Sequence, residues 1–438
     1  MSQSAPTPDA PKFSDALKFW WKLGWISFGG PAGQIAIMHQ EIVDKRRWMD
    51  DDHFLHALNF CMLLPGPEAM QLATYLGWRL HGVRGGIAAG ALFVLPSALL
   101  LLGLSWLYMA AGDVTWVKGI FDGLEPAVIA IVLSAMLKIG GKTLRTPALW
   151  AIAALSFIGI FFLNISFVLI IAGAAATGLI GARWLPSQFP AKQTPPTDTS
   201  GQSLSAHAPL PDVPKPTLGR NLRVLTSGLC IWLVPLIAIG AWLGWNGTHF
   251  QEGIFFSKAA LITFGGAYAV LPYVAQQAVD IHGWLDHGQM MAGLGLAETT
   301  PGPLIMVLQF VGFAGGWQHP PVGMSPLTSG TLAAAVTSWT TFLPCFMFIF
   351  LGGPYVESMR NKPAIAAALT AITAAVVGVI LNLAIWFALH ALDLANGGIN
   401  GFVAIAATLS FAAMKWLKLD LLWVLAACAL AGLGLQLI

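Results

Sequence analysis

The chain has 438 residues, of which 56% are hydrophobic and only 10% are charged, and its formal net charge is +2. A soluble protein of this length could not bury so much apolar surface, so the composition excludes a soluble globular domain and predicts a polytopic membrane protein. The small net charge gives no indication of nucleic-acid binding.

The N-terminal segment 1–13 is polar and has no apolar core of signal-peptide length, so we expect a cytoplasmic tail that is not cleaved. Beyond it, apolar segments long enough to cross a bilayer alternate with polar loops. The run 183–223 is rich in Pro, Ser and Thr, which predicts a flexible cytoplasmic linker. Uninterrupted apolar segments lie approximately at 85–111, 123–138, 147–163, 165–182, 224–245, 328–352, 364–390, 399–414 and 420–438.

A stretch of the first half returns in the second half. Residues 22–67 align without a gap with residues 258–303, a constant difference of 236 in residue number (258 minus 22), and fourteen aligned positions are identical. The identical residues are mostly Gly, Pro, Trp and charged types, so apolar composition does not explain them. Two Gly- and Pro-broken copies of one unit are typical of a repeat-built transporter. We therefore predict transporter repeats at 14–182 and 250–438, with one extra crossing at 224–245.

The basic residues predict that the two repeats are inverted. Lys and Arg cluster in the loops of the first half, which places those loops in the cytoplasm, whereas the matching second-half loops 275–289 and 314–327 contain none. The extra crossing explains the inversion. Each repeat crosses the membrane an even number of times, so one further crossing between them gives the second repeat the opposite orientation. The clusters are Lys12/Lys18, Lys45–Arg47, Arg79/Arg84 and Lys138/Lys142/Arg145 in the first half, and Arg360/Lys362 and Lys415/Lys418 in the second.

Four apolar segments, at 14–38, 54–78, 250–274 and 290–316, are interrupted by Phe-Gly-Gly or Pro-Gly-Pro. If 54–78 crossed fully, a basic loop on one side of it would lie outside the cell, so we favour re-entrant hairpins that enter and leave on one side. The alternative is discontinuous helices that span fully, which also gives inversion. The predicted fold class is an all-α polytopic membrane protein with two inverted-topology repeats.

The two motifs supply the candidate substrate site. Glycine permits unusual backbone angles and close approach, and Pro-Gly-Pro breaks one helix and starts another. A half-helix that starts inside the membrane presents unpaired N–H groups and a positive dipole, which favour an anion; packing kinks are the alternative. The candidate substrate-binding residues are Lys22, Phe28, Gly29, Gly30, Pro65, Gly66, Pro67, Gln71, Lys258, Gly265, Gly266, Thr299, Thr300, Pro301, Gly302 and Pro303.

Charged residues flank the motifs. Lys22 and Lys258 each lie six residues before a Phe-Gly-Gly, where a lysine in the membrane would compensate an anion; snorkelling to the interface is the alternative. Glu68 follows the first Pro-Gly-Pro, and Glu298 precedes the second by three residues. A carboxyl group in a low-dielectric site can carry a proton, so both are candidates for proton coupling, with helix capping as the alternative for Glu68.

Other residue patterns argue for structure rather than chemistry. Asp50 and Asp286 are expected to cap helices, and Trp48 and Trp284 to lie at the membrane interface. The four cysteines have no metal-ligand spacing and are expected to be buried hydrophobes. The chain has no HExxH or GxSxG motif, and its histidines form no ligand cluster, so we expect neither an enzyme nor a cofactor or metal.

These motifs resemble the chromate ion transporter (CHR) family in its long two-domain form. The resemblance rests on both Phe-Gly-Gly runs, on the region 45–48, on LLPGPEAMQLATYLGWRLHGVRGGIAAG at 63–90 and on TTPGPLIMVLQFVGFAGG at 299–316. It implies secondary active export of chromate, a tetrahedral divalent oxyanion, across the bacterial inner membrane, driven by the proton-motive force. Sulfate or a related oxyanion, and an anion channel, are the alternatives. The oligomeric state stays open, a homodimer being one alternative.

Overall fold

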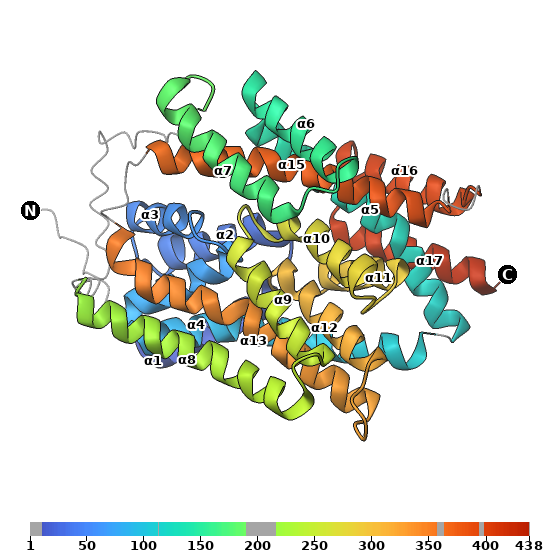
Figure 1. Cartoon of the computed structure of the whole chain (residues 1–438), viewed down its shortest axis with the longest axis horizontal. Helices are drawn as coiled ribbons and strands as arrows, with labels where there is room; N and C mark the ends of the chain where they lie inside the picture. The colour runs from blue at the N-terminus through green and yellow to red at the C-terminus, as the bar shows by residue number, and fades with distance from the viewer. Residues whose placement is uncertain (1–10, 113, 190–215, 357–362, 394–397, 438) are drawn as a thin grey trace, which may run out of the picture.

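The computed structural model describes residues 11–112, 114–189, 216–356, 363–393 and 398–437, and in these ranges the protein is helical and has no β-strand (Figure 1). The predicted all-α membrane fold is therefore confirmed. Most of the predicted tail and linker, together with the basic pair Arg360 and Lys362, lies outside the described residues.

The first half begins with short helices that are broken at the two motifs and ends with three longer helices. Its elements are α1 (Phe13–Ile26), α2 (Gly30–His39), the π-helix η1 (Gln40–Lys45), α3 (Asp51–Cys61), α4 (Glu68–Ala111), α5 (Thr115–Thr143), α6 (Pro147–Phe161) and α7 (Phe167–Trp184). Non-helical backbone angles at His81 and Gly82 divide α4 into a short arm and a long arm.

The second half follows the same order of elements. They are α9 (Thr248–Ile262), α10 (Ala267–Ala275), the π-helix η2 (Gln276–Ile281), α11 (His287–Thr299), the 3-10 turn η3 (Leu304–Met306), α12 (Val307–Gln318), α13 (Pro326–Gly352), the 3-10 turn η4 (Gly353–Tyr355), α15 (Pro363–Ala391), α16 (Gly401–Lys415) and α17 (Leu421–Leu437). Both halves carry a π-helix at the same point of the order, immediately after the helix that follows Phe-Gly-Gly.

The helix α8 (Leu218–Leu243) connects the halves and begins six residues before the predicted crossing at 224–245. The early start has a structural reason, because its first turn is tied to the end of α13. Arg220 Nη2 donates a hydrogen bond to Phe350 O at 2.7 Å, and Asn221 Nδ2 donates to Tyr355 Oη at 2.6 Å.

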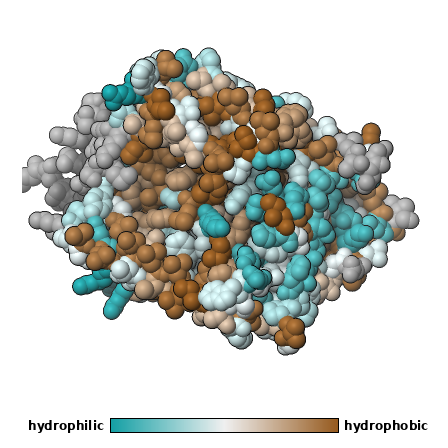
Figure 2. Space-filling model, in the orientation of Figure 1, coloured by the Kyte–Doolittle hydropathy of each residue, from teal (hydrophilic) through white to brown (hydrophobic). Residues whose placement is uncertain are grey.

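Six helices among the described residues are long and apolar enough to cross a bilayer: α4, α5, α7, α8, α13 with η4, and α15. The helices α6, α16 and α17 and the pair η3–α12 are apolar but shorter. Apolar side chains cover much of the left and upper surface in Figure 2, while polar side chains gather to the right, around α11. A broad apolar exterior of this kind suits contact with lipid.

The interrupted segments of the first half leave the core at one end of the molecule. The rings of Phe13 and His81 lie 5.3 Å apart, so the start of α1 and the end of the short arm of α4 are neighbours. The loop between α2 and α3 lies near them, because the guanidinium of Arg46 packs on the rings of Phe19 and Trp48. We call this the basic end.

The second half repeats this arrangement at another place, which we call the far end. His282 occupies the position of Arg46 and stacks on Trp284, with Phe255 beside it. His249, at the start of α9, binds Ser329 O, and Gln318 Nε2 donates to Trp284 O. Helix α13 begins at this far end and finishes beside Trp78 at the basic end. Its 27 residues separate the two ends by about 40 Å at the usual rise of a helix.

Trp48 and Trp284 are buried in these clusters, and their place at the membrane interface stays a prediction. Each packs against a basic or titratable side chain. The capping expectation is confirmed: Asp50 accepts from His53 N, and Asp286 forms a capping box with Gln289. Cys61, Cys345 and Cys428 are buried as expected, whereas Cys230 is exposed on α8.

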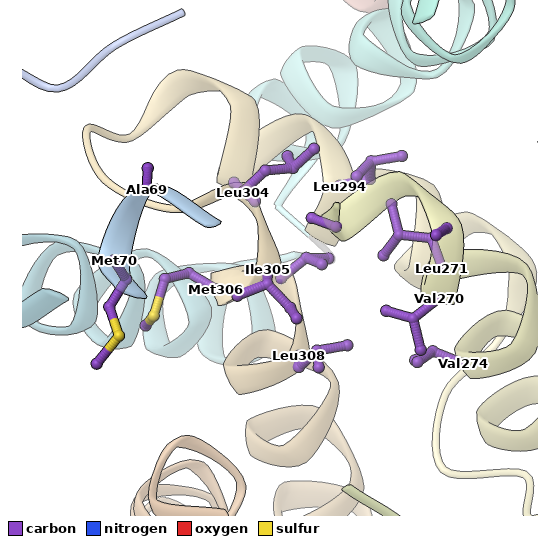
Figure 3. Close-up of a cluster of buried hydrophobic side chains, with 14 of the residues drawn as sticks. Ala69, Met70, Val270, Leu271, Val274, Leu294, Leu304, Ile305, Met306 and Leu308 are labelled. Atoms are coloured by element: carbon purple, nitrogen blue, oxygen red, sulfur yellow. The ribbon is translucent and has the colours of Figure 1, made fainter. Parts of the chain in front are cut away.

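The longer helices of the two halves exchange partners. Helix α15 packs against α6 and α7 of the first half, and α5 packs against α16 and α17 of the second half (Figure 1). The apolar core lies between these layers. Figure 3 shows its centre, where Ala69 and Met70 at the start of α4 face η3, and η3 packs in turn against α10 and α11. The start of α4 and the turn η3, which follow the two Pro-Gly-Pro motifs, thus pack into one core.

Candidate functional site

The four motif breaks meet in two pairs, and each pair joins the two halves. Gly302 N–H donates a hydrogen bond to Ser27 O at 2.8 Å, which binds the second Pro-Gly-Pro to the first Phe-Gly-Gly. Gly66 N–H donates to Thr263 O at 2.7 Å, which binds the first Pro-Gly-Pro to the second Phe-Gly-Gly. Ser27 and Thr263 are equivalent positions directly before the two motifs. We call the pairs the first crossing (with Ser27) and the second crossing (with Thr263).

Glycine is required at these contacts for its backbone angles and its size. Gly66 and Gly302 have φ values of +123° and +105°, which other residues rarely adopt. A Cβ on Gly66 would lie 2.7 Å from Cys345 Sγ, and one on Gly302 would lie 2.7 Å from Ser97 Cβ. Each Pro-Gly-Pro therefore packs directly on a long helix of the other half, α13 or α4.

Four helices begin at the crossings, and none of them has a side-chain cap. The N-cap residues of α2, α4, α10 and η3 are glycine or proline, and none of them makes a side-chain cap hydrogen bond. Aspartates cap α3 and α11, whereas α1, α5, α6, α7 and α9 also lack a side-chain cap. The first N–H groups of a helix have no partner within the helix, and they carry its positive dipole. The crossings therefore concentrate helix N-termini, which favour an anion.

Both candidate carboxylates lie at the second crossing. A Cβ on Gly266 would lie 4.0 Å from Glu68 Oε1, so Glu68 reaches the start of α10 from the other half. Tyr268 Oη donates a short hydrogen bond to Glu298 Oε1, which brings Glu298 to the first turn of the same helix. Thr373 of α15 lies opposite Gly265. The second crossing thus combines helix N-termini, two carboxyl groups and hydroxyl groups.

The first crossing has a different chemical character. Leu304 stands where Glu68 stands in the other half, and Phe28, Gly29 and the helix α2 are more exposed than their counterparts. A Cβ on Gly29 or Gly30 would meet no atom within 4 Å. Gln34 bridges the two segments of this crossing, since its Nε2 donates to Gly302 O at 2.6 Å and to Ser27 O at 3.2 Å.

The remaining candidate residues fall into two groups. Gln71 is at the second crossing, where its Nε2 donates to Pro65 O at 2.7 Å. Thr299 and Thr300 flank the second Pro-Gly-Pro, but their hydroxyl groups donate to carbonyl groups of their own helix, Leu296 O and Ala297 O. Pro67 and Pro303 each lie one residue before the helix start that they were expected to occupy.

Lys22 and Lys258 are exposed on α1 and α9, on the face of each helix that points away from the buried side chains. Neither lysine takes part in the contacts that form the two crossings. The compensation of a bound anion by these lysines stays a prediction.

Sequence reasoning missed Gln34, Tyr268 and the packing pair Ser97 and Cys345. The pair had a detectable signal: Leu95-Pro96-Ser97 and Leu343-Pro344-Cys345 match at a difference of 248 (345 minus 97), so the repeat resumes after a 12-residue insertion (248 minus 236). Among the described residues, no three His, Cys, Asp or Glu side chains gather as metal ligands.

Two hollows occupy equivalent places beside α2 and α10. The hollow beside α2 and η1 has a volume of about 700 Å³ and is lined by Ala36, His39, Gln40 and Asp44, with α3 opposite. The hollow beside α10 and η2 is lined by the equivalent Pro272, Ala275, Gln276 and Asp280 but measures only about 190 Å³. It is smaller because α15 and the end of α6 cover it, through Trp386 and Phe161 among others.

The family model for chromate transporters matches residues 14–179 and 250–433. The chain is 29% identical over 417 residues to the chromate transport protein of Cupriavidus metallidurans (95% of this chain, 92% of that protein). It is 31% identical over 417 residues to the chromate transport protein of Pseudomonas aeruginosa (94% and 89%) and 28% identical over 364 residues to a probable chromate transport protein of Synechococcus elongatus (83% and 81%). No solved structure matches the chain. The paired motif crossings thus lie in a multi-pass membrane protein that belongs to the chromate transporter family.

Proposed function

We propose that this protein is a secondary active transporter that exports chromate from the cytoplasm across the inner membrane. The observation that carries the proposal is the second crossing, where two helices from different halves begin without caps beside titratable side chains. Membership of the chromate transporter family supports the same substrate. Sulfate, which has the same tetrahedral shape and charge, is the second candidate.

A tetrahedral dianion fits this site because donors approach it from several directions. The starts of α4 and α10 supply backbone N–H groups from the two halves, while the hydroxyl groups of Tyr268 and Thr373 already donate to Glu298 Oε1 and Leu369 O. Burial of a divalent anion without compensating charge or hydrogen bonds is costly. We therefore place the substrate between the starts of α4 and α10, with the two carboxyl groups in their protonated form.

Protonation of Glu68 and Glu298 would couple the substrate to protons. A dianion beside a carboxyl group favours its neutral form, and by reciprocity the neutral form favours the dianion. The membrane potential, negative inside, pushes a dianion outward, by about 2.3 kcal/mol per charge for each 100 mV. The electrical part of the proton-motive force drives export when fewer than two protons leave with each dianion, because two co-transported protons would cancel its charge; the carboxyl groups set the pH dependence.

The positions of the two ends suggest how the site reaches water. The basic end carries the first-half clusters Lys12/Lys18, Lys45–Arg47 and Arg79/Arg84, so we place it in the cytoplasm with the N-terminus, and we place the far end outside. The larger hollow beside α2 then opens to the cytoplasm, while its counterpart beside α10 is covered by α15 and α6. If the hollow beside α2 closed and the hollow beside α10 opened, the site would become accessible from the opposite side of the membrane.

Uptake of labelled chromate into inside-out vesicles tests the proposal, with membranes lacking the protein as the control. We expect accumulation that rises when the vesicles are energised, collapses with a protonophore and is reduced by excess sulfate if sulfate shares the site. Accumulation that follows the membrane potential alone, and is unchanged when only the pH gradient is collapsed, would indicate a channel instead. Sulfate uptake without chromate uptake would assign the second candidate.

A further inference from the structure

The most deeply buried carboxylate of the described chain lies outside both crossings. Glu252, in the second turn of α9, has no exposed surface, and neither of its carboxylate oxygens has a hydrogen-bond partner. It packs against α12 at Gly315, where a Cβ would lie 2.2 Å from Glu252 Oε1. A carboxylate that is fully buried and unpaired cannot keep its charge, so Glu252 holds a proton in this structure.

A histidine lies one turn away, nearer the far end. His249 is also fully buried, and its Nε2 lies 3.0 Å from Ser329 O. Because a carbonyl oxygen only accepts, Nε2 carries the hydrogen, and Nδ1 keeps a free lone pair with no partner. The side chain can therefore take a proton at Nδ1 and pass one on. His249 and Glu252 are spaced i, i+3 and lie on the same side of α9.

The titratable side chains that contact Gly315 and Trp284, beside Glu252, are the histidines His319 and His282. From the end of α12, His319 binds Gly315 O through Nδ1. From the loop before α11, Trp284 packs on Gly315 and carries His282 on its other face. From α13 and α8, the side chains beside the adjacent His249 and Gly253 are the neutral Ser329, Val336 and Leu236. No basic side chain among these neighbours would hold Glu252 in its charged form.

The first half has no equivalent of this pair. The positions of His249 and Glu252 are occupied there by Phe13 and Ala16, and the position of Gly315 is occupied by Arg79. The same place in the fold therefore bears a buried cation in one half and a buried acid in the other. Symmetry of the repeat does not explain Glu252, and neither does helix capping, because α9 receives no side-chain cap hydrogen bond.

We propose that Glu252 is a proton-binding site, separate from the oxyanion site, which exchanges its proton with the far end through His249. This inference rests on the proposed function for its role in coupling, but not for the binding of the proton. In the state described here Glu252 is occupied and sealed, while the larger hollow is open beside α2. Release of the proton would require water to reach Glu252, and therefore α9 and α12 to separate.

Infrared difference spectroscopy of the purified full-length protein tests proton binding without any transport. At neutral pH we expect a carbonyl stretch of a protonated carboxyl group, at the high frequency of an acid without hydrogen bonds, that is absent in Glu252→Gln and retained in Glu41→Gln. Glu41 is a suitable control because it is paired with Lys45 and Arg46. An unchanged band in Glu252→Gln would overturn the proposal.

A transport experiment tests the coupling. In proteoliposomes, Glu252→Gln should keep exchange of internal for external chromate within about twofold of wild type but lose the stimulation by an imposed pH gradient. Stimulation equal to wild type would overturn the coupling role even if the infrared band is lost. His249→Phe, which copies the first half, should retain the infrared band and slow proton exchange; unchanged exchange would remove His249 from the path. Absence of chromate transport in wild type would instead refute the proposed function, and the infrared result would still stand.

Discussion

Replacement of Gly66 by alanine should weaken the protein far more than replacement of a helical glycine with open space around it, such as Gly103. The backbone of Gly66 has a φ of +123°, which costs about 1–3 kcal/mol for a residue with a Cβ. The new Cβ would also lie 2.7 Å from Cys345 Sγ and 2.9 Å from Gln71 Nε2, and overpacking of this kind costs about 1–3 kcal/mol. The two effects together predict a loss of about 2–6 kcal/mol.

The assay is the apparent melting temperature of the purified protein in detergent, followed by transport at a temperature where the variant is folded. Gly103→Ala is the matched control, because Gly103 lies in α4 with no atom near its missing Cβ, and alanine favours a helix there. Cys345→Ala in the Gly66→Ala background should restore part of the stability, since it removes the contact with sulfur but leaves the backbone angle. Equal melting temperatures for Gly66→Ala and Gly103→Ala would refute the crossing as a constraint.

Three further predictions concern charge and access. Glu68→Gln, and to a lesser extent Glu298→Gln, should keep chromate binding but flatten the pH dependence of transport in vesicles; wild-type profiles in both would make these residues structural. Lys22→Gln and Lys258→Gln should each lower transport at unchanged membrane abundance, and a near-normal double variant would remove them from anion compensation. In a Cys230→Ala background, Asp44→Cys should react with an impermeant thiol reagent only from the cytoplasm and Asp280→Cys only from outside, because both aspartates are exposed at equivalent positions; labelling of both from one side would contradict inversion.

The positions of the breaks could be predicted from sequence because Gly and Pro impose them locally. The Phe-Gly-Gly and Pro-Gly-Pro motifs end or start helices wherever they occur, and the structure places breaks at all four. The repeat alignment shows which positions are equivalent, but equivalence does not state which break touches which. The contact between Gly66 and Thr263 joins residues of different halves, and only the packing of the whole chain determines it.

The outward orientation of the lysines could have been predicted from their positions in the helical repeat. On α1 the side chains of Phe19 and Leu23 are buried, and Lys22 falls on the opposite face of the same helix. Period-3.6 analysis of the segment would have indicated an outward lysine. Glu252 could not be recognised in the same way, because an acidic residue near the start of a helix is ordinary, and only its burial reveals that it has no hydrogen-bond partner.

Direct observation of the bound substrate tests the central claim most closely. We predict that a structure determined by electron cryomicroscopy with saturating chromate will show the anion at the second crossing, within hydrogen-bond distance of the backbone N–H groups at Gly266 and Ala267 and beside Glu68. The same density should be absent from a matched sample without chromate. An anion bound at the first crossing, or at the exposed lysines alone, would contradict the account.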